Sequence, residues 1–267
     1  MLTRANRFLR RSAAIAVLGV GGLTVAAPAA AQGSYEIQVY PSALAPPRST
    51  MFELHSNVTP SGITTTSDGT QPNDDAVHET LEITHGFNEW FETGFYVFTS
   101  ARAGDGWQYV GSHIRPRFSI PERFKWPVGL SLSQEIGYQR SMFSADTWTW
   151  EIRPIIDQQL GPVNWSVNVA FEKTLQGEHV NDGWGIAPAA KLAVDVTPKV
   201  ALGLEYYGDI GSTKNIEPWR SCSHQLFGVM DLNLAPEWEF NAGLGFGLTP
   251  ASDSFVIKVI VGYRIGK

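Results

Sequence analysis

The chain has 267 residues, a single cysteine and a formal net charge of −6. Four of its 20 basic residues lie in a leader-like N-terminus that holds no acidic residue. A processed chain therefore keeps 16 basic and 26 acidic residues, which is a net charge of about −10. Such an acidic chain argues against nucleic-acid binding, because phosphates require a basic surface. The lone Cys222 excludes an intrachain disulfide.

The N-terminus has the pattern of a secretory signal peptide. Four arginines between Arg4 and Arg11 precede an apolar run over 13–25, and three alanines end at Ala31. A positive start, a short apolar run and small residues are typical of a cleaved leader, whereas a spanning helix needs roughly 20 apolar residues. We therefore expect a signal peptide over 1–31, and a proline-containing periplasmic N-terminal stretch over 32–50.

The rest of the chain alternates with a period of two. In 128–140, for example, Leu130 and Leu132 alternate with Ser131 and Ser133. Side chains on a strand point to opposite faces, and a tilted strand needs about 9–11 residues to cross a bilayer. Twelve segments fit this pattern: 51–58, 76–86, 90–100, 107–120, 128–140, 147–158, 164–173, 184–196, 199–208, 222–234, 238–248 and 254–265.

The connections between these segments alternate between short and long. An even number of strands, with tight turns at one end and longer loops at the other, is the outer-membrane pattern. We predict an all-β fold: a closed antiparallel transmembrane β-barrel of about 12 strands over 51–267, in the bacterial outer membrane.

Charged side chains are expected on the inner face of this barrel. A charge facing lipid at mid-bilayer costs roughly 2–4 kcal/mol. The predicted pore-lining set is polar, mixed in sign and net acidic: Glu82, His113, Arg115, Arg117, Glu135, Glu151, Arg153, Asp157, Lys191, Glu205, Asp231 and Lys258. We expect Arg115, Arg117 and Arg153 to meet Glu135, Glu151 and Asp157, because neighbouring strands are about 4.8 Å apart.

Three functions are compatible with such a lumen. A narrow aqueous channel for small solutes is favoured by inward glycines that leave room: Gly94, Gly111, Gly129, Gly137, Gly203, Gly243, Gly245 and Gly247. These glycines could equally accommodate large neighbours, and a closed structural barrel would then pair its interior charges.

A lipid-acting enzyme is the third alternative. Cys222 and His224 share a face, as a nucleophile and its base must. A thiol beside an exposed histidine is the simpler interpretation, and no GxSxG, CxxC or HExxH motif is present. We expect a non-enzyme with no catalytic residue, no metal and no cofactor.

The chain resembles bacterial outer-membrane β-barrel proteins over its mature length. Two segments, YEIQVY (Tyr35–Tyr40) and HETLEITHGF (His78–Phe87), are similar to a proteobacterial group related to transporters of phenol-degradation pathways, the MetA-pathway type. This resemblance implies a transport role and assigns no catalytic residue. The implied partners are outer-membrane lipid and lipopolysaccharide, the barrel-insertion machinery, and a small solute that the sequence does not identify.

Overall fold

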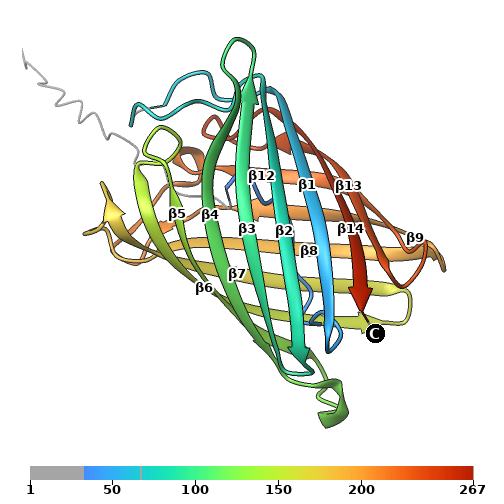
Figure 1. Cartoon of the computed structure of the whole chain (residues 1–267). Coiled ribbons are helices and arrows are strands. Elements are labelled where there is room, and N and C mark those ends of the chain that lie inside the picture. Colours follow the sequence, from blue (N-terminus) through green and yellow to red (C-terminus); the bar gives the residue numbers. More distant parts are fainter. Residues whose placement is uncertain (1–32, 67, 267) are drawn as a thin grey trace, which may run out of the picture.

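A computed structural model describes residues 33–66 and 68–266, so the expected signal peptide lies outside the described residues. Twelve antiparallel strands form a closed barrel, which confirms the predicted fold (Figure 1). Each strand pairs with its neighbour in the chain, and β1 pairs with β14 to close the wall. The strands are β1 (Ser49–Ser61), β2 (Ala76–Asn88), β3 (Phe91–Arg102), β4 (Gly106–Ser119), β5 (Gly129–Gln139), β6 (Asp146–Leu160), β7 (Val163–Gly177), β8 (Gly185–Thr197), β9 (Val200–Gly208), β12 (His224–Leu232), β13 (Trp238–Gly247) and β14 (Phe255–Gly266).

The connections carry four small elements that the sequence did not predict. The loop between β9 and β12 contains a hairpin of β10 (Gly211–Ser212) and β11 (Asn215–Ile216), followed by the 3-10 helix η2 (Trp219–Ser221). A second 3-10 helix, η1 (Glu122–Phe124), lies between β4 and β5. Among the described residues, no helix is long and apolar enough to cross a membrane.

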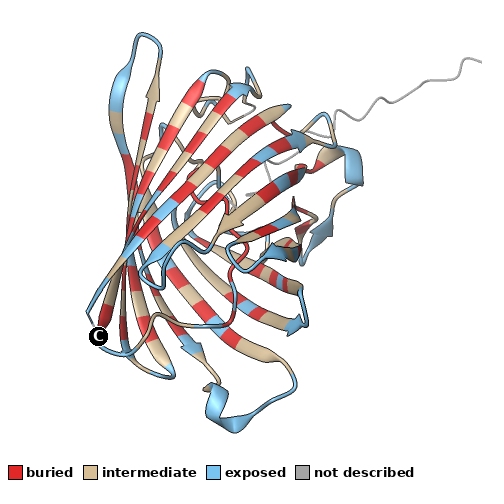
Figure 2. Cartoon of the chain, turned by 90° about the vertical axis from the view of Figure 1, so that its right-hand side faces the viewer, coloured by how far each residue is buried: buried red, intermediate tan, exposed pale blue. Residues whose placement is uncertain are grey.

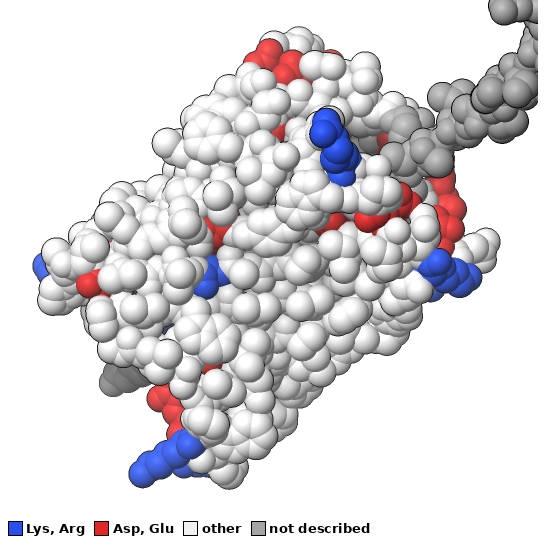
Figure 3. Space-filling model, turned by 180° about the vertical axis from the view of Figure 1, so that it is seen from behind, with Lys and Arg blue, Asp and Glu red and all other residues white. Residues whose placement is uncertain are grey.

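The barrel wall has one polar and one apolar face. Burial alternates along the strands (Figure 2), so that in β9 the exposed Leu202 and Leu204 alternate with Ala201 and the buried Glu205. The surface in Figure 3 is dominated by uncharged side chains, with most charged ones toward its margins. The period-two pattern therefore turns most of its large apolar side chains outward and most of its charges inward, with a few inward aromatics such as Phe98 and Phe227.

The N-terminal stretch that we expected in the periplasm lies instead inside the barrel. We call residues 33–48 the inner segment. At the end with the long loops, Ser34 accepts hydrogen bonds from Asn57 and Asn73. At the opposite end, where the short turns lie, the Arg48 N–H donates to Gly86 O, and β1 begins. The chain thus runs through the lumen before it enters the wall (Figure 1).

Burial explains this placement. All six residues of Tyr35–Tyr40 are buried, so both faces of this extended stretch avoid solvent. Ile37 and Val39 join a core cluster with Tyr207 and Phe227 from the inner wall. The wall therefore buries the apolar side chains of the inner segment and supplies hydrogen-bond partners to several of its backbone groups, such as Tyr35 O and Ile37 O.

Candidate functional site

The lumen is the candidate site, and side chains of the wall hold the inner segment at successive levels. Thr80 Oγ1 donates to Tyr35 O at 2.6 Å, and Lys258 Nζ donates to Ile37 O at 3.0 Å. Asn168 bonds both backbone groups of Tyr40, at 2.8 and 2.9 Å. These are side-chain to backbone contacts from β2, β14 and β7, so the segment is not a strand of the sheet.

Three arginines of the predicted set converge on one aromatic ring. The guanidinium groups of Arg115, Arg117 and Arg153 lie 4.5, 5.6 and 5.3 Å from the centroid of Tyr40. Cations over an aromatic face are attracted by its quadrupole, more strongly where water is excluded. Tyr40, which the sequence analysis did not select, therefore organises the centre of the lumen.

The expected ion pairs of these arginines are partly wrong. Arg115 Nη2 contacts Glu82 Oε1 at 2.6 Å, and Arg117 Nε contacts Glu92 Oε1 at 2.8 Å. Their partners thus come from β2 and β3. Glu92 lies directly opposite Arg117 in the register of β3 and β4, while Arg115 reaches past Gly94 on β3 to Glu82 on β2. Glu135 instead contacts His113 on β4.

The expected contact of Arg153 is confirmed. Arg153 Nε lies 2.7 Å from Glu151 Oε1 on the same face of β6. Asp157 lies on the same face of β6, four residues after Arg153. It accepts hydrogen bonds from the Ser42 N–H at 2.8 Å and from Ser42 Oγ at 2.6 Å. Strand β6 therefore holds the inner segment at Ser42 through Asp157.

A second charged cluster occupies the opposite wall. Glu205 on β9 contacts Lys258 and lies 3.1 Å from Lys191, which also contacts Asp231 at 2.8 Å. The Tyr207 hydroxyl donates to Glu205 at 2.6 Å. All twelve predicted residues thus lie on the inner wall, and a pore-lining role for them stays a prediction.

A polar cavity of about 850 Å³ opens beside the inner segment at the end with the short turns. It lies between the segment and the strands of the second cluster. Its charged lining comprises Glu122, Asp157, Lys191, Asp195, Glu205, Asp231 and Glu239. This cavity could hold hydrated solutes, whereas residues at the level of Tyr96, Phe98 and His55 are sealed from solvent.

The inward glycines accommodate large neighbours and do not widen a channel. A Cβ on Gly137 would overlap the ring of His113, and one on Gly245 would overlap the ring of Phe227. On Gly94 it would lie 2.9 Å from Thr84 and 3.3 Å from Arg115. The room that these glycines leave is therefore already filled, which removes one argument for an open channel.

The candidate pair of a lipid-acting enzyme is not assembled. His224 Nδ1 lies 2.7 Å from the Tyr206 hydroxyl, and its ring stacks on Trp219 at 3.5 Å. Cys222 is buried and free. Within the described part of the chain, no hydrogen bond joins Cys222 to His224.

Comparisons with known proteins agree on the fold. No protein-family model and no curated protein matches the chain. Among solved structures, the COG4313 outer membrane channel from Pseudomonas putida F1 has a TM-score of 0.56 and 10% identity, with 86% of this chain and 100% of that one covered. A KdgM porin has a TM-score of 0.53 and 9% identity over 81% of this chain and 99% of that one.

A third solved structure, the NanC porin, has a TM-score of 0.51 and 7% identity over 81% of this chain and 99% of its own. Matches with identities this low show that the fold is shared, but they assign no role to individual residues. The fold of this chain is therefore that of the outer-membrane β-barrel channels, of which these three are examples.

Proposed function

We propose that this protein is a bacterial outer-membrane channel for small polar solutes, closed by its inner segment and opened when that segment moves. The observation that carries the proposal is the polar cavity of about 850 Å³, which ends against residues 38–43 of the segment. Movement of these residues would connect the cavity with the rest of the lumen.

The exterior supports an outer-membrane location. Exposed leucines such as Leu204 and Leu244 cover the wall, while charges are turned inward or lie at the ends. In water this wall would expose a large apolar surface, whereas in a bilayer it meets acyl chains. Membrane lipid and lipopolysaccharide are the surroundings that this wall fits.

The mobility required of the segment is compatible with its contacts. It is attached by hydrogen bonds from side chains and not by a ladder of backbone pairs, so it can move without breaking the barrel. Each neutral hydrogen bond contributes about 1 kcal/mol net, and each bond to a charged group such as Asp157 or Lys258 about 1.5–3 kcal/mol.

The cavity chemistry favours hydrated solutes. Lys191 stands among Asp231, Glu205 and Asp157, so both signs of charge line the wall. Opposed charges orient small polar molecules in a narrow path. The likeness of two short segments to phenol-pathway transporters points to aromatic solutes, which this lining suits less well.

A reversible tether tests the proposal. A Cβ on Gly129 would lie 3.1 Å from Ser42 Cβ, near the roughly 3.5–4.5 Å found in disulfides. It would also overlap Asp157 Oδ1, so the Asp157 carboxylate, which loses its bond from Ser42 Oγ in this variant, must turn aside. In a Cys222→Ser background, Ser42→Cys with Gly129→Cys should lock the segment when oxidised. Single-channel recordings in planar bilayers should show conductance that is lost on oxidation and returns on reduction, and each single-cysteine variant is the control.

The closed structural barrel is the competing function, and the buried ion pairs of both clusters favour it. Deletion of residues 34–44 separates the two. A channel without its obstruction should conduct several-fold more than the wild type. If the deletion variant folds and neither it nor the reduced protein conducts, the transport proposal is rejected.

A further inference from the structure

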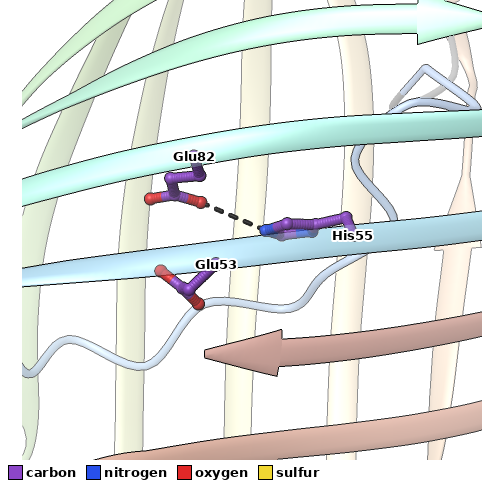
Figure 4. Close-up of side chains that lie close together, drawn as sticks. All are labelled: Glu53, His55 and Glu82. Carbon is purple, nitrogen blue, oxygen red and sulfur yellow. Dashed lines mark ion pairs between the residues drawn. The ribbon is translucent and has the colours of Figure 1, made fainter. Parts of the chain in front are cut away.

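Three ligand-type side chains meet on the inner wall at the pairing of β1 and β2 (Figure 4). Glu53 lies directly opposite Glu82 in the register, and His55 follows on the same face of β1. One carboxylate oxygen from each glutamate and a ring nitrogen of His55 all lie within 4.8 Å of one another. All three residues are buried: 7% of Glu53, none of His55 and 1% of Glu82 is exposed.

The carboxylates of this cluster lack sufficient cationic partners. Like charges directly opposite across two strands destabilise a sheet. Glu239 extends the same row, because it pairs with Gly262, which in turn pairs with Glu53. Among the described residues, no arginine, lysine or histidine lies within ion-pair distance of Glu53 or Glu239.

The nearby arginines are already paired. Arg115 contacts Glu82 through Oε1, and Arg117 contacts Glu92. Pairing these four side chains leaves the buried Glu53 without a cationic partner. Glu239, which lines the polar cavity and accepts a hydrogen bond from Gln38 Nε2 at 3.2 Å, adds a second carboxylate beside it. One divalent cation would supply the missing charge, with Glu82 Oε2 still available to it.

His55 provides an independent indication of a ligand. Neither of its ring nitrogens makes a hydrogen bond with any described residue, although the side chain is fully buried. Its Nε2 points at Glu82 Oε2, 3.3 Å away, and that oxygen also lacks a hydrogen bond (Figure 4). This contact is an ion pair if His55 is protonated, and a bound cation would satisfy the same two atoms with a neutral imidazole. Buried polar groups without hydrogen bonds are rare and costly, so one of these two arrangements is required.

We propose that Glu53, His55 and Glu82 bind a divalent transition-metal ion of the Zn²⁺ type. Zinc bonds of about 2.0–2.2 Å in a tetrahedron place two ligand atoms roughly 3.3 Å apart. This matches the separation of His55 Nε2 and Glu82 Oε2. An imidazole ligand favours Zn²⁺ over Ca²⁺ or Mg²⁺, which prefer oxygen. The fourth position is left for water.

The structural consequence is a cross-link between the first two strands. Glu53 and His55 come from β1 and Glu82 from β2, so one ion would join them on the lumen side. Bound metal should raise the unfolding temperature, because a ligand that binds only the folded state stabilises it by mass action.

Metal binding by the refolded full-length barrel tests this inference. The protein is stripped with EDTA, refolded into detergent, and titrated with Zn²⁺ by calorimetry, with metal added both during and after refolding. We expect one equivalent that His55→Gln or Glu53→Gln removes or weakens at least tenfold. His78→Gln is the matched control, because His78 is equally buried on β2, its ring nitrogens also lack hydrogen bonds, and it lies outside the cluster.

Two further readouts keep the test independent of folding yield. Heat-modifiable gel migration shows which variants are folded, and Co²⁺ absorption in the visible range reports a four-coordinate site with a nitrogen ligand. The proposal is overturned if the folded wild type takes up no Zn²⁺, or if His78→Gln loses the same equivalent as His55→Gln. A protonated His55 in the metal-free barrel, seen by NMR together with no Zn²⁺ uptake, would show that an imidazolium ion supplies the charge instead.

Discussion

Replacement of Lys258 by methionine gives a quantitative test of how the lumen is held. Lys258 is completely buried and contacts Glu205, while its Nζ also donates to Ile37 O at 3.0 Å. Breaking a buried pair by removing one partner costs about 3–5 kcal/mol, because a charge stays behind without compensation.

The remaining contacts of Glu205 set the expected magnitude. Lys191 still lies 3.1 Å away, and the Tyr207 hydroxyl still donates at 2.6 Å. The loss in free energy of unfolding should therefore fall at the lower end of this range, about 3 kcal/mol. About 1.5 kcal/mol of it is the charged hydrogen bond to Ile37 of the inner segment.

Urea unfolding in lipid vesicles, followed by tryptophan fluorescence, measures this loss. Lys191→Met is the control, because its side chain is 19% exposed and water can solvate the carboxylates that it leaves; about 1 kcal/mol is expected. Lys258→Met with Glu205→Gln should recover part of the stability. A loss below about 1 kcal/mol for Lys258→Met, or full additivity in the double variant, would refute the reasoning.

Three further predictions address facing, packing and pH. Leu204→Lys, on the exposed outer wall, should make membrane insertion less favourable by roughly 2–4 kcal/mol and so lower the yield of assembled barrel. Asn164→Lys, beside Asp195 in the cavity, should assemble normally. Equal yields would show that the two residues do not face opposite sides of the wall as stated. Gly137→Ala should cost about 1–3 kcal/mol in urea unfolding, because the added methyl overlaps His113, while Gly228→Ala, with no atom within 4 Å, should be neutral. Burial raises the pKa of Asp209, in the loop after β9, from 3.8 to about 6, against hydrogen bonds from the Gly211 and Ile210 N–H groups. Because the folded pKa is the higher one, this contribution is complete below about pH 4 and is lost as pH rises through 6. The free energy of local unfolding of the loop should fall by about 3 kcal/mol between these two pH values, as measured by hydrogen exchange. The Asp209→Asn variant should show no such dependence on pH.

The sequence predicted the wall well because period-two alternation is a local property. Leucines and charges alternate within each segment, so the number of strands, the closed fold and the inward position of residues such as Arg115 and Glu205 could be predicted. The observed strand ends differ from the predicted ones by a few residues; β1, for example, begins at Ser49 and not at 51.

What lies inside the wall could not be predicted in this way. The burial of Tyr40 depends on Ser166 and Asn168, more than 120 residues away in the chain. The partners of Arg115 come from β2 and β3, because they depend on what else fills the lumen. One local signal was available, since YEIQVY would bury both faces of an extended stretch only if surrounded on all sides.

The path of the inner segment also links it to the seam that closes the barrel. The chain enters β1 at the end with the short turns, yet residues 33–48 run from the other end through the lumen. The seam that closes the wall, β1 against β14, joins the first and the last strand of the sheet. Lys258 on β14 donates to Ile37 O, 221 residues away in the chain, so the inner segment contacts the last strand of the sheet directly. The wall therefore surrounds the described segment that precedes it in the chain, and a change at the seam of β1 and β14 would be felt by that segment through Lys258.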